Sequence, residues 1–263
     1  MERSPQRVLV TGGTSGIGYE IARQYHQAGA RVLAVGRNPS ALQKLSAEGI
    51  DVLEADVRDA PATLIATAVA RLGGLDVLIN NAAIQLHDDY LSPRSDDTQA
   101  LGDSIHGQED ELSFVLSRIG TEIAVNLTAP LQLAVAALPH LSAKPGGCVV
   151  FVSSGLAIAP KRSAPVYCAT KAGLSTFARA FRYQCEDANS GISVIDAMLP
   201  FTDTPMTEGR GQKSKKANAV DVAAAIIKGA SRGTPVLWIG QARLLRVIRR
   251  LSPNLAYKIL RNA

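Results

Sequence analysis

The sequence predicts an α/β fold in which an open, doubly wound sheet of about seven parallel strands carries helices on both faces. Two observations lead to this prediction. Short β-branched segments, apolar nearly throughout, alternate with longer helical segments, as expected of parallel strands that are buried on both sides. No linker, internal repeat or break in composition divides the 263 residues, so we expect a single domain over 1–263.

The elements follow one another in a regular order, and the connections between parallel strands are expected to be right-handed. Each apolar strand segment is followed by a segment with helical periodicity. The predicted strands are 7–12, 31–36, 51–56, 75–80, 147–153, 192–199 and 235–240, and the predicted helices include 16–29, 59–72, 109–141 and 165–190.

Two segments depart from this alternation. Residues 91–113 form a polar, acidic excursion with proline and glycine, and residues 205–219 form a basic loop that contains glycine. Both follow the carboxyl ends of strands, where ligands bind in sheets of this kind. Each segment is therefore either part of a binding site or a surface loop without a role in binding.

Composition narrows the class of protein. Hydrophobic residues make up 46% of the chain and charged residues 19%, as in a globular protein with a large core. The N-terminus lacks the features of a signal peptide, and no apolar run approaches the ~20 residues that span a bilayer, so we expect a cytoplasmic protein.

The three cysteines lack a CxxC spacing and are expected to be reduced thiols. His26, His106 and His140 show no metal-binding spacing.

A glycine-rich stretch, TGGTSGIG, follows the first predicted strand and opens the first predicted helix. Glycines at such a turn allow the backbone to approach a pyrophosphate, and the helix N-terminus offers free N–H groups. A plain turn would also use glycine, but the strand before and the helix after this stretch favour dinucleotide binding. The sheet is thus predicted to be of the Rossmann type.

The end of the second predicted strand indicates which dinucleotide is bound. An NAD site usually has an acidic residue there for the ribose 2′-hydroxyl, whereas this chain has Gly36 followed by Arg37. An arginine can pair with a 2′-phosphate, and Thr14 and Ser15 are near enough in sequence to assist. NADP(H) is therefore predicted in preference to NAD(H), although Arg37 could instead be a solvated surface residue.

Tyr167 and Lys171, in VYCATKAG, stand four residues apart on a predicted helix and so share one face. An ammonium beside a tyrosine, together with the positive nicotinamide ring of an oxidised cofactor, stabilises the tyrosinate and lowers the tyrosine pKa. Tyr167 would then be able to donate and accept a proton near neutral pH. Taken alone, the pair could equally be an ordinary helix pair.

Together these motifs resemble the short-chain dehydrogenase/reductase (SDR) family, and the resemblance runs from about Val8 to Met206. Asn80 to Ala83 match its NNAG element with Ala83 in place of glycine, Asn126 matches its helix asparagine, and Ser154 lies thirteen residues before Tyr167. The segments INNAAIQ, EIAVNLTAPLQL and VSSGLAIAPKRSAPVYCATKAG are similar to a subgroup of oxidoreductases associated with D-alanylation genes.

The resemblance implies an NADP(H)-dependent oxidoreductase that interconverts a ketone or aldehyde and an alcohol. Tyr167 would be the acid and base, Ser154 would hydrogen-bond the reacting oxygen, and Asn126 would hold a water that joins Lys171 to a proton relay. Gln85 and His87, just past NNAA, would edge the substrate pocket. The cofactor would contact Gly12, Thr14, Ser15, Gly16, Ile17, Gly18, Arg37, Asp56, Val57, Asn81, Ala82, Ala83, Tyr167, Lys171, Pro200, Phe201, Thr202 and Thr204.

The sequence departs from the family pattern after the sixth predicted strand. Where the family has Pro-Gly, this chain has Leu199 and Pro200. Pro200 has no N–H, but Phe201 and Thr202 still offer theirs to the nicotinamide carboxamide, and Thr204 can keep its hydroxyl role.

Charge is distributed unevenly along the chain, whose net charge is +5. Eight acidic residues and one arginine lie between Asp88 and Glu111, and eight Lys/Arg but no acid follow Asp221. The basic part lacks aromatic interleaving and a nucleic-acid-binding motif, so no nucleic-acid partner is expected. Residues 241–263 combine an apolar stripe with arginines; an interfacial membrane helix is one interpretation, and the resemblance favours a pocket wall or a subunit contact in a homodimer or homotetramer.

Two other functions remain open from the sequence. The chain could be a dinucleotide-binding sensor or scaffold that kept the fold without the chemistry, but such a protein need not retain Asn126, Ser154, Tyr167 and Lys171 together. It could also catalyse sugar epimerisation, which the short chain and the absence of a second predicted domain disfavour.

Overall fold

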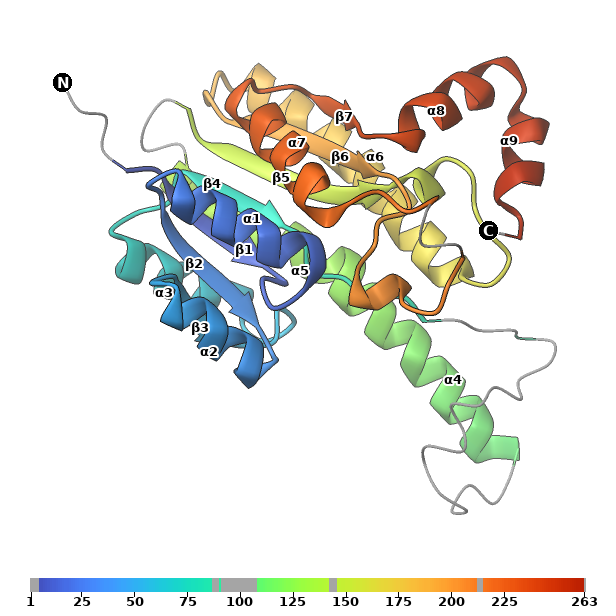
Figure 1. Cartoon of the computed structure of the whole chain (residues 1–263), viewed down its shortest axis with the longest axis horizontal. Coiled ribbons are helices and arrows are strands. Elements are labelled where there is room, and N and C mark those ends of the chain that lie inside the picture. The colour runs from blue at the N-terminus through green and yellow to red at the C-terminus, as the bar shows by residue number, and fades with distance from the viewer. Residues whose placement is uncertain (1–4, 87–89, 91–107, 142–145, 212–214, 263) are drawn as a thin grey trace.

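The computed structural model of the chain describes residues 5–86, 90, 108–141, 146–211 and 215–262. Its centre is a sheet of seven parallel strands in the order β3-β2-β1-β4-β5-β6-β7 (Figure 1). The strands are β1 (Arg7–Thr11), β2 (Arg31–Gly36), β3 (Asp51–Glu54), β4 (Val77–Asn80), β5 (Cys148–Ser154), β6 (Ser193–Leu199) and β7 (Val236–Trp238). This arrangement confirms the predicted fold class.

Strand residues alternate between two separate cores, because successive side chains of a strand point to opposite faces of the sheet. Leu9 of β1 packs in one core, with Leu33 and Val35 of β2. Val8 and Val10 pack in the other. Both cores are apolar, which explains why these strands read as continuous hydrophobic runs rather than as alternating ones.

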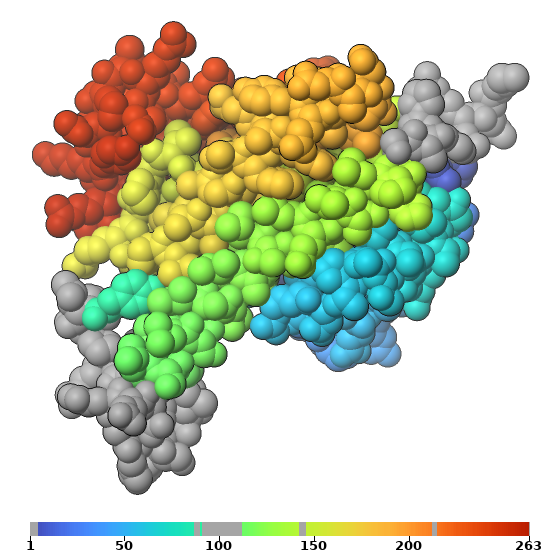
Figure 2. Space-filling model, turned by 180° about the vertical axis from the view of Figure 1, so that it is seen from behind, coloured from blue at the N-terminus to red at the C-terminus, as the bar shows by residue number. Residues whose placement is uncertain are grey.

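Helices cover both faces of the sheet. On one face lie α1 (Gly16–Gln27), α2 (Pro39–Ala47) and α7 (Ala219–Ser231), which bury side chains such as Ile21, Leu45 and Ile226. On the other face lie α3 (Pro61–Leu72), α5 (Ala129–Leu141) and α6 (Pro165–Asp187). Figure 1 shows α1 and α7 in front of the sheet, and Figure 2 shows α5 and α6 from behind, in green and yellow.

A long helical stretch joins the acidic excursion to the sheet. It consists of α4 (Gln108–Ile123), a π-helical turn (Ala124–Thr128) and α5, and α4 projects beyond the sheet (Figure 1). Helix α4 already begins at Gln108, so the end of the predicted 91–113 excursion is helical, while 91–107 lies outside the described residues. The part Leu112–Leu141 has the length and hydropathy of a membrane span, but Leu133, Ala137 and Leu141 of its α5 portion pack in the core.

The basic C-terminal segment forms two helices, α8 (Gln241–Leu251) and α9 (Pro253–Leu260). Leu245 of α8 contacts Gly155, and Arg249 donates a hydrogen bond from Nε to the carbonyl of Ile158 at 3.0 Å. The segment therefore packs beside the residues that follow β5. Its other face exposes an apolar stripe at Leu244, Val247 and Leu251.

The cysteines and part of the 205–219 loop can also be placed. Cys148, Cys168 and Cys185 are buried free thiols. The loop opens with a short 3₁₀ turn, Pro205–Thr207, and ends where α7 begins at Ala219, with residues 212–214 outside the described part.

Candidate functional site

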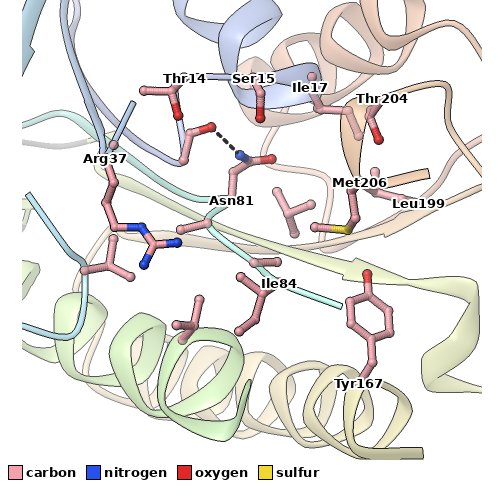
Figure 3. Close-up of a pocket in the computed structure, with 18 of the residues that line it drawn as sticks. Thr14, Ser15, Ile17, Arg37, Asn81, Ile84, Tyr167, Leu199, Thr204 and Met206 are labelled. Carbon is pink, nitrogen blue, oxygen red and sulfur yellow. Dashed lines mark hydrogen bonds between the residues drawn. The ribbon is translucent and has the colours of Figure 1, made fainter. Parts of the chain in front are cut away.

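A cavity of about 260 Å³ opens at the carboxyl ends of the central strands. Figure 3 shows Arg37 at one end and Tyr167 at the other, with the Tyr167 hydroxyl directed inwards. The cavity thus lies where the strand order reverses between β1 and β4, as expected for a ligand site in a doubly wound sheet. Its lining residues are Gly12, Thr14, Ser15, Gly16, Ile17, Gly36, Arg37, Ala55, Asp56, Val57, Asn81, Ala82, Ala83, Ile84, Val125, Val152, Ser153, Tyr167, Lys171, Leu199, Thr204 and Met206.

The turn between β1 and α1 has no room for side chains at its glycines. Gly12 has φ +64°, and a Cβ there would lie 2.8 Å from Cα of Ala82. A Cβ on Gly18 would collide with the carbonyl of Gly12 and with the amide of Asn81. This close approach brings the N-terminus of α1 to the cavity wall, so the turn fits a pyrophosphate. Gly18 itself is not a lining residue and acts through packing.

Asn81 ties the end of β4 to this turn. Its Nδ2 donates to the carbonyls of Thr11 and Gly12 at 3.1 and 3.2 Å, and Figure 3 draws the bond to the turn. The backbone N–H groups of Asn81 and Ala82 both donate to Thr11 Oγ1, at 3.0 and 3.1 Å. The NNAA segment is therefore a structural brace for the cavity as well as part of its lining.

The far end of the cavity, at β2, is positively charged. A Cβ on Gly36 would collide with the Thr14 side chain, so an acidic side chain cannot be accommodated there without movement. Arg37 donates from Nη1 to Asp56 Oδ2 at 3.2 Å, and Arg58 contacts both carboxylate oxygens at 3.0 and 2.9 Å. The Arg58 hydrogen bonds hold the pKa of Asp56 down at about 2.

Tyr167 and Lys171 both lie on the buried face of α6 and both line the cavity. Lys171 Nζ lies 5.6 Å from the centroid of the Tyr167 ring and donates to the carbonyl of Val152 at 2.8 Å. Burial raises the pKa of Tyr167, and a hydrogen bond from Ser154 opposes that rise. In the chain by itself, burial therefore outweighs the contacts that lower this pKa, whereas the sequence-based expectation also counted the positive ring of an oxidised nicotinamide.

Lys171 is almost completely enclosed, with 2% of its surface exposed. Burial lowers its pKa to about 8, against the attraction of the carboxylates of Asp196 and Glu122. Asp196, on β6, accepts hydrogen bonds from Ser153 and from Ser175, the latter at 2.6 Å. The ammonium is therefore held by a backbone carbonyl and attracted by buried carboxylates, and its pKa of about 8 lies well below that of an exposed lysine.

Ser154 ends β5 and lies beside Tyr167 without lining the main cavity. Its Oγ accepts a hydrogen bond from the backbone N–H of Leu156 at 3.1 Å, which caps the 3₁₀ turn Gly155–Ala157. This bond fixes the Oγ position next to the Tyr167 hydroxyl.

Asn126 lies in the π-helical turn, fully buried and outside the cavity. Its Oδ1 accepts from the backbone N–H of Ile84 and its Nδ2 donates to the carbonyl of the same residue, both at 2.8 Å. These two bonds hold the segment after β4 in place. The side chain of Asn126 therefore positions Ile84, which lines the cavity beside Tyr167.

Four residues of the segment after β6 were predicted to contact the cofactor, and one of them lines the cavity. Thr204 lines the cavity, together with Leu199 and Met206, and its methyl group packs against Gly16. Three further predicted contacts, Pro200, Phe201 and Thr202, are not lining residues.

Of the two predicted substrate residues, Gln85 can be placed and His87 lies outside the described residues. Gln85 Oε1 accepts a hydrogen bond from Arg210 Nη1 at 2.7 Å. Arg210 comes from the loop after β6, and its charge acts on Tyr167. Among the described residues, no group of three or more His, Cys, Asp and Glu could hold a metal ion.

Sequence reasoning missed two kinds of residue. Apolar side chains that line the cavity carry no motif, although most stand next to a motif residue. Arg58 and Arg210 were missed because a single arginine in a polar stretch resembles a solvated surface residue; only the position of Arg58, two residues after Asp56, could have identified it. The missed apolar lining residues are Ala55, Ile84, Val125, Val152 and Met206.

Comparisons with known proteins agree with this geometry. The family model for short chain dehydrogenases matches residues 6–215. An uncharacterised oxidoreductase of Bacillus subtilis strain 168, DltE, is 34% identical over 219 residues, which cover 82% of this chain and 77% of that protein. An uncharacterised oxidoreductase of Staphylococcus aureus strain USA300 is 29% identical over 226 residues, which cover 83% of this chain and 88% of that protein. The similarity to DltE confirms the subgroup that the sequence resembles.

Solved structures show the same architecture. A short chain dehydrogenase from Burkholderia cenocepacia J2315, in complex with NADP, is 26% identical with a TM-score of 0.69, and the match covers 88% of this chain and 95% of that one. A short-chain dehydrogenase from Streptomyces avermitilis matches 98% of this chain and 100% of its own with a TM-score of 0.73, and at 21% identity it shows the fold alone.

Replacing Lys171 with methionine is expected to stabilise the folded chain below pH 8. The pKa of Lys171 falls from 10.5 to about 8 on folding, so the ionised ammonium opposes folding by about 3 kcal/mol at most. This penalty is fully present below pH 8 and fades as pH rises towards 10.5, where the lysine is neutral in both states. Urea unfolding of wild type and Lys171→Met across this range measures the difference.

The matched control is Lys228→Met, which removes an exposed ammonium from α7. A difference between wild type and Lys171→Met that stays constant with pH would contradict the burial penalty.

Proposed function

The chain belongs to the short chain dehydrogenase family, and within that family we propose that it is an NADP(H)-dependent oxidoreductase. It would interconvert a ketone or aldehyde and an alcohol. The observation that carries this proposal is the Tyr167 hydroxyl, which faces a cavity built on the glycine turn and has Lys171 one helical turn away.

The residues present fit a dinucleotide. Gly12 and Gly18 have no room for a Cβ, so the turn packs closely, and the N-terminus of α1 offers its N–H groups to a pyrophosphate. Asp56 and Val57 would border the adenine end, and Thr204 the nicotinamide end. When bound, the cofactor would supply the hydride for reduction or accept it in oxidation.

The preference for NADP(H) rests on the charges at the end of β2. Arg37 and Arg58 share the single carboxylate of Asp56, so the cluster keeps one net positive charge. The side chain of Arg37 is 62% exposed. Because it is so exposed, it can turn towards a 2′-phosphate. An acidic residue that would hold a 2′-hydroxyl is excluded at position 36 by Thr14.

The chain's own groups would carry the proton. Tyr167 would donate its hydroxyl proton to the carbonyl oxygen as the carbonyl carbon accepts the hydride, and it would take a proton back from an alcohol in the reverse direction. Ser154 would donate a hydrogen bond to the same oxygen as negative charge develops there. Lys171, whose pKa of about 8 is close to neutral, would return a proton towards Tyr167.

Tyr167→Phe is expected to lower turnover by about 10²- to 10⁴-fold while NADPH affinity stays the same, because only the proton donor is removed. Reduction of carbonyl compounds followed by NADPH absorbance measures turnover, and fluorescence titration measures affinity. The control is Tyr183→Phe, an exposed tyrosine of the same helix. Wild-type turnover in Tyr167→Phe would refute the assigned role.

Arg37→Ala and Arg58→Ala are each expected to weaken NADPH binding by about tenfold or more, because the first removes a cation that lines the cavity and the second leaves the Asp56 carboxylate less neutralised beside the 2′-phosphate. NADH affinity should change little. Titration of both cofactors tests this, with Arg71→Ala, an exposed arginine paired with Asp51, as the control. Equal weakening of NADPH and NADH would contradict the NADP(H) assignment.

A further inference from the structure

The side of Tyr167 that faces the loop after β6 is lined by cationic and hydrogen-bond-donating groups. Arg210, half-buried in that loop, donates to Gln85 Oε1 at 2.7 Å. Burial lowers the pKa of Arg210. The negative charge of an ionised Tyr167 has the opposite effect and raises the pKa of Arg210. Arg210 and Tyr167 are therefore near enough for their charges to interact, and the bond to Gln85 holds the guanidinium on the segment after β4.

A second cation lies near the first. Lys161, in the loop before α6, has only 9% of its surface exposed. Burial lowers its pKa, and the charge of Arg210 lowers it further. Among the residues that the structure describes, no carboxylate forms an ion pair with either cation. Two partly desolvated like charges without a counter-ion are stabilised when an anion binds between them.

Gln85 supplies an unsatisfied donor at the same place. Its Oε1 is used by Arg210, whereas its buried Nε2 has no hydrogen-bond partner. Buried polar groups in folded proteins are nearly always paired, so this N–H indicates an acceptor that a ligand would provide. The donor belongs to the segment after β4, which Asn126 holds in place through Ile84.

We propose that Arg210, Lys161 and the Nε2 of Gln85 form a subsite for an oxyanion of the substrate, a carboxylate or a phosphate. The substrate class is then a carbonyl compound, or the corresponding alcohol, that also carries such an acidic group. This proposal rests on the oxidoreductase function proposed above. A planar guanidinium with a neighbouring N–H donor suits either oxyanion, because both present two acceptor oxygens in one plane.

The test compares acids with their neutral esters in wild-type protein. The probes are acetoacetate, levulinate and 4-carboxybenzaldehyde, each beside its methyl ester, together with 4-formylphenyl phosphate to distinguish phosphate from carboxylate. At least one acid should be reduced with a higher kcat/KM than its ester, by about 10- to 100-fold, as expected for a charge-assisted hydrogen bond.

Two variants locate the effect. Arg210→Gln should raise KM for the preferred acid by about 10- to 100-fold and leave KM for its ester nearly unchanged. Gln85→Glu should also abolish the preference, because the new carboxylate would occupy Arg210. The control Lys215→Gln removes an exposed charge from the same loop and should keep the preference. Unchanged NADPH affinity and circular dichroism show that each variant is folded.

A binding measurement separates this proposal from the proposed function. Calorimetric titration of the same acids and esters into Tyr167→Phe, with and without NADPH, reports the subsite without turnover. Acid-selective binding without reduction of any carbonyl compound would support the subsite and refute the oxidoreductase. Reduction of carbonyl compounds without any preference for an acid, in binding or in turnover, would overturn the subsite and leave the oxidoreductase in place.

Discussion

The close approach of helix α1 to the ends of β1 and β4 is the constraint on which the site depends. A Cβ on Gly18 would strike the Gly12 carbonyl and the Asn81 amide, and that same amide holds the turn through two backbone carbonyls. The phosphate-binding geometry is therefore produced by packing and does not require a charged side chain. Because Asn81 begins the segment that continues to Ile84 and Gln85, the position of this turn also sets the position of that segment at the cavity.

Burial of the Lys171 ammonium is unfavourable for the free energy of folding. An ammonium this deeply enclosed is tolerated because the carbonyl of Val152 accepts a hydrogen bond from it and the charges of Asp196 and Glu122 attract it. The arrangement destabilises the ionised lysine, yet it brings the lysine pKa close to neutral, which a proton-transfer group needs. The tyrosine experiences the opposite effect, since burial raises its pKa. The same enclosure therefore draws the two pKa values apart, raising that of the tyrosine and lowering that of the lysine.

The sequence predicted the sheet, its parallel strands and the place of the ligand site, because each follows from local patterns: apolar strand runs, a glycine turn and i,i+4 spacing. It could not predict which arginines face the cavity. Arg210 reaches Gln85 only because a loop after β6 folds back over a segment 125 residues earlier, and no local pattern encodes that contact. The rise of the Tyr167 pKa in the chain alone was not predicted for a similar reason, since burial depends on the complete tertiary packing. The excursion at 91–107, His87 and the oligomeric state stay predictions.

The cationic groups at the β2 end of the cavity and those around Arg210 differ in how they are held, and this difference bears on recognition. At the β2 end, Asp56 fixes Arg58 through both carboxylate oxygens, so this guanidinium is positioned by the chain before a ligand arrives, while the more exposed Arg37 is held by one bond. At the Tyr167 end, Arg210 is held by a neutral amide, and Lys161 adds repulsion to it. A preorganised cluster binds its anion with little reorganisation. A cluster with unbalanced charge gains more from the anion itself, so discrimination between a charged and a neutral ligand is expected to be sharper at the Tyr167 end than at the β2 end.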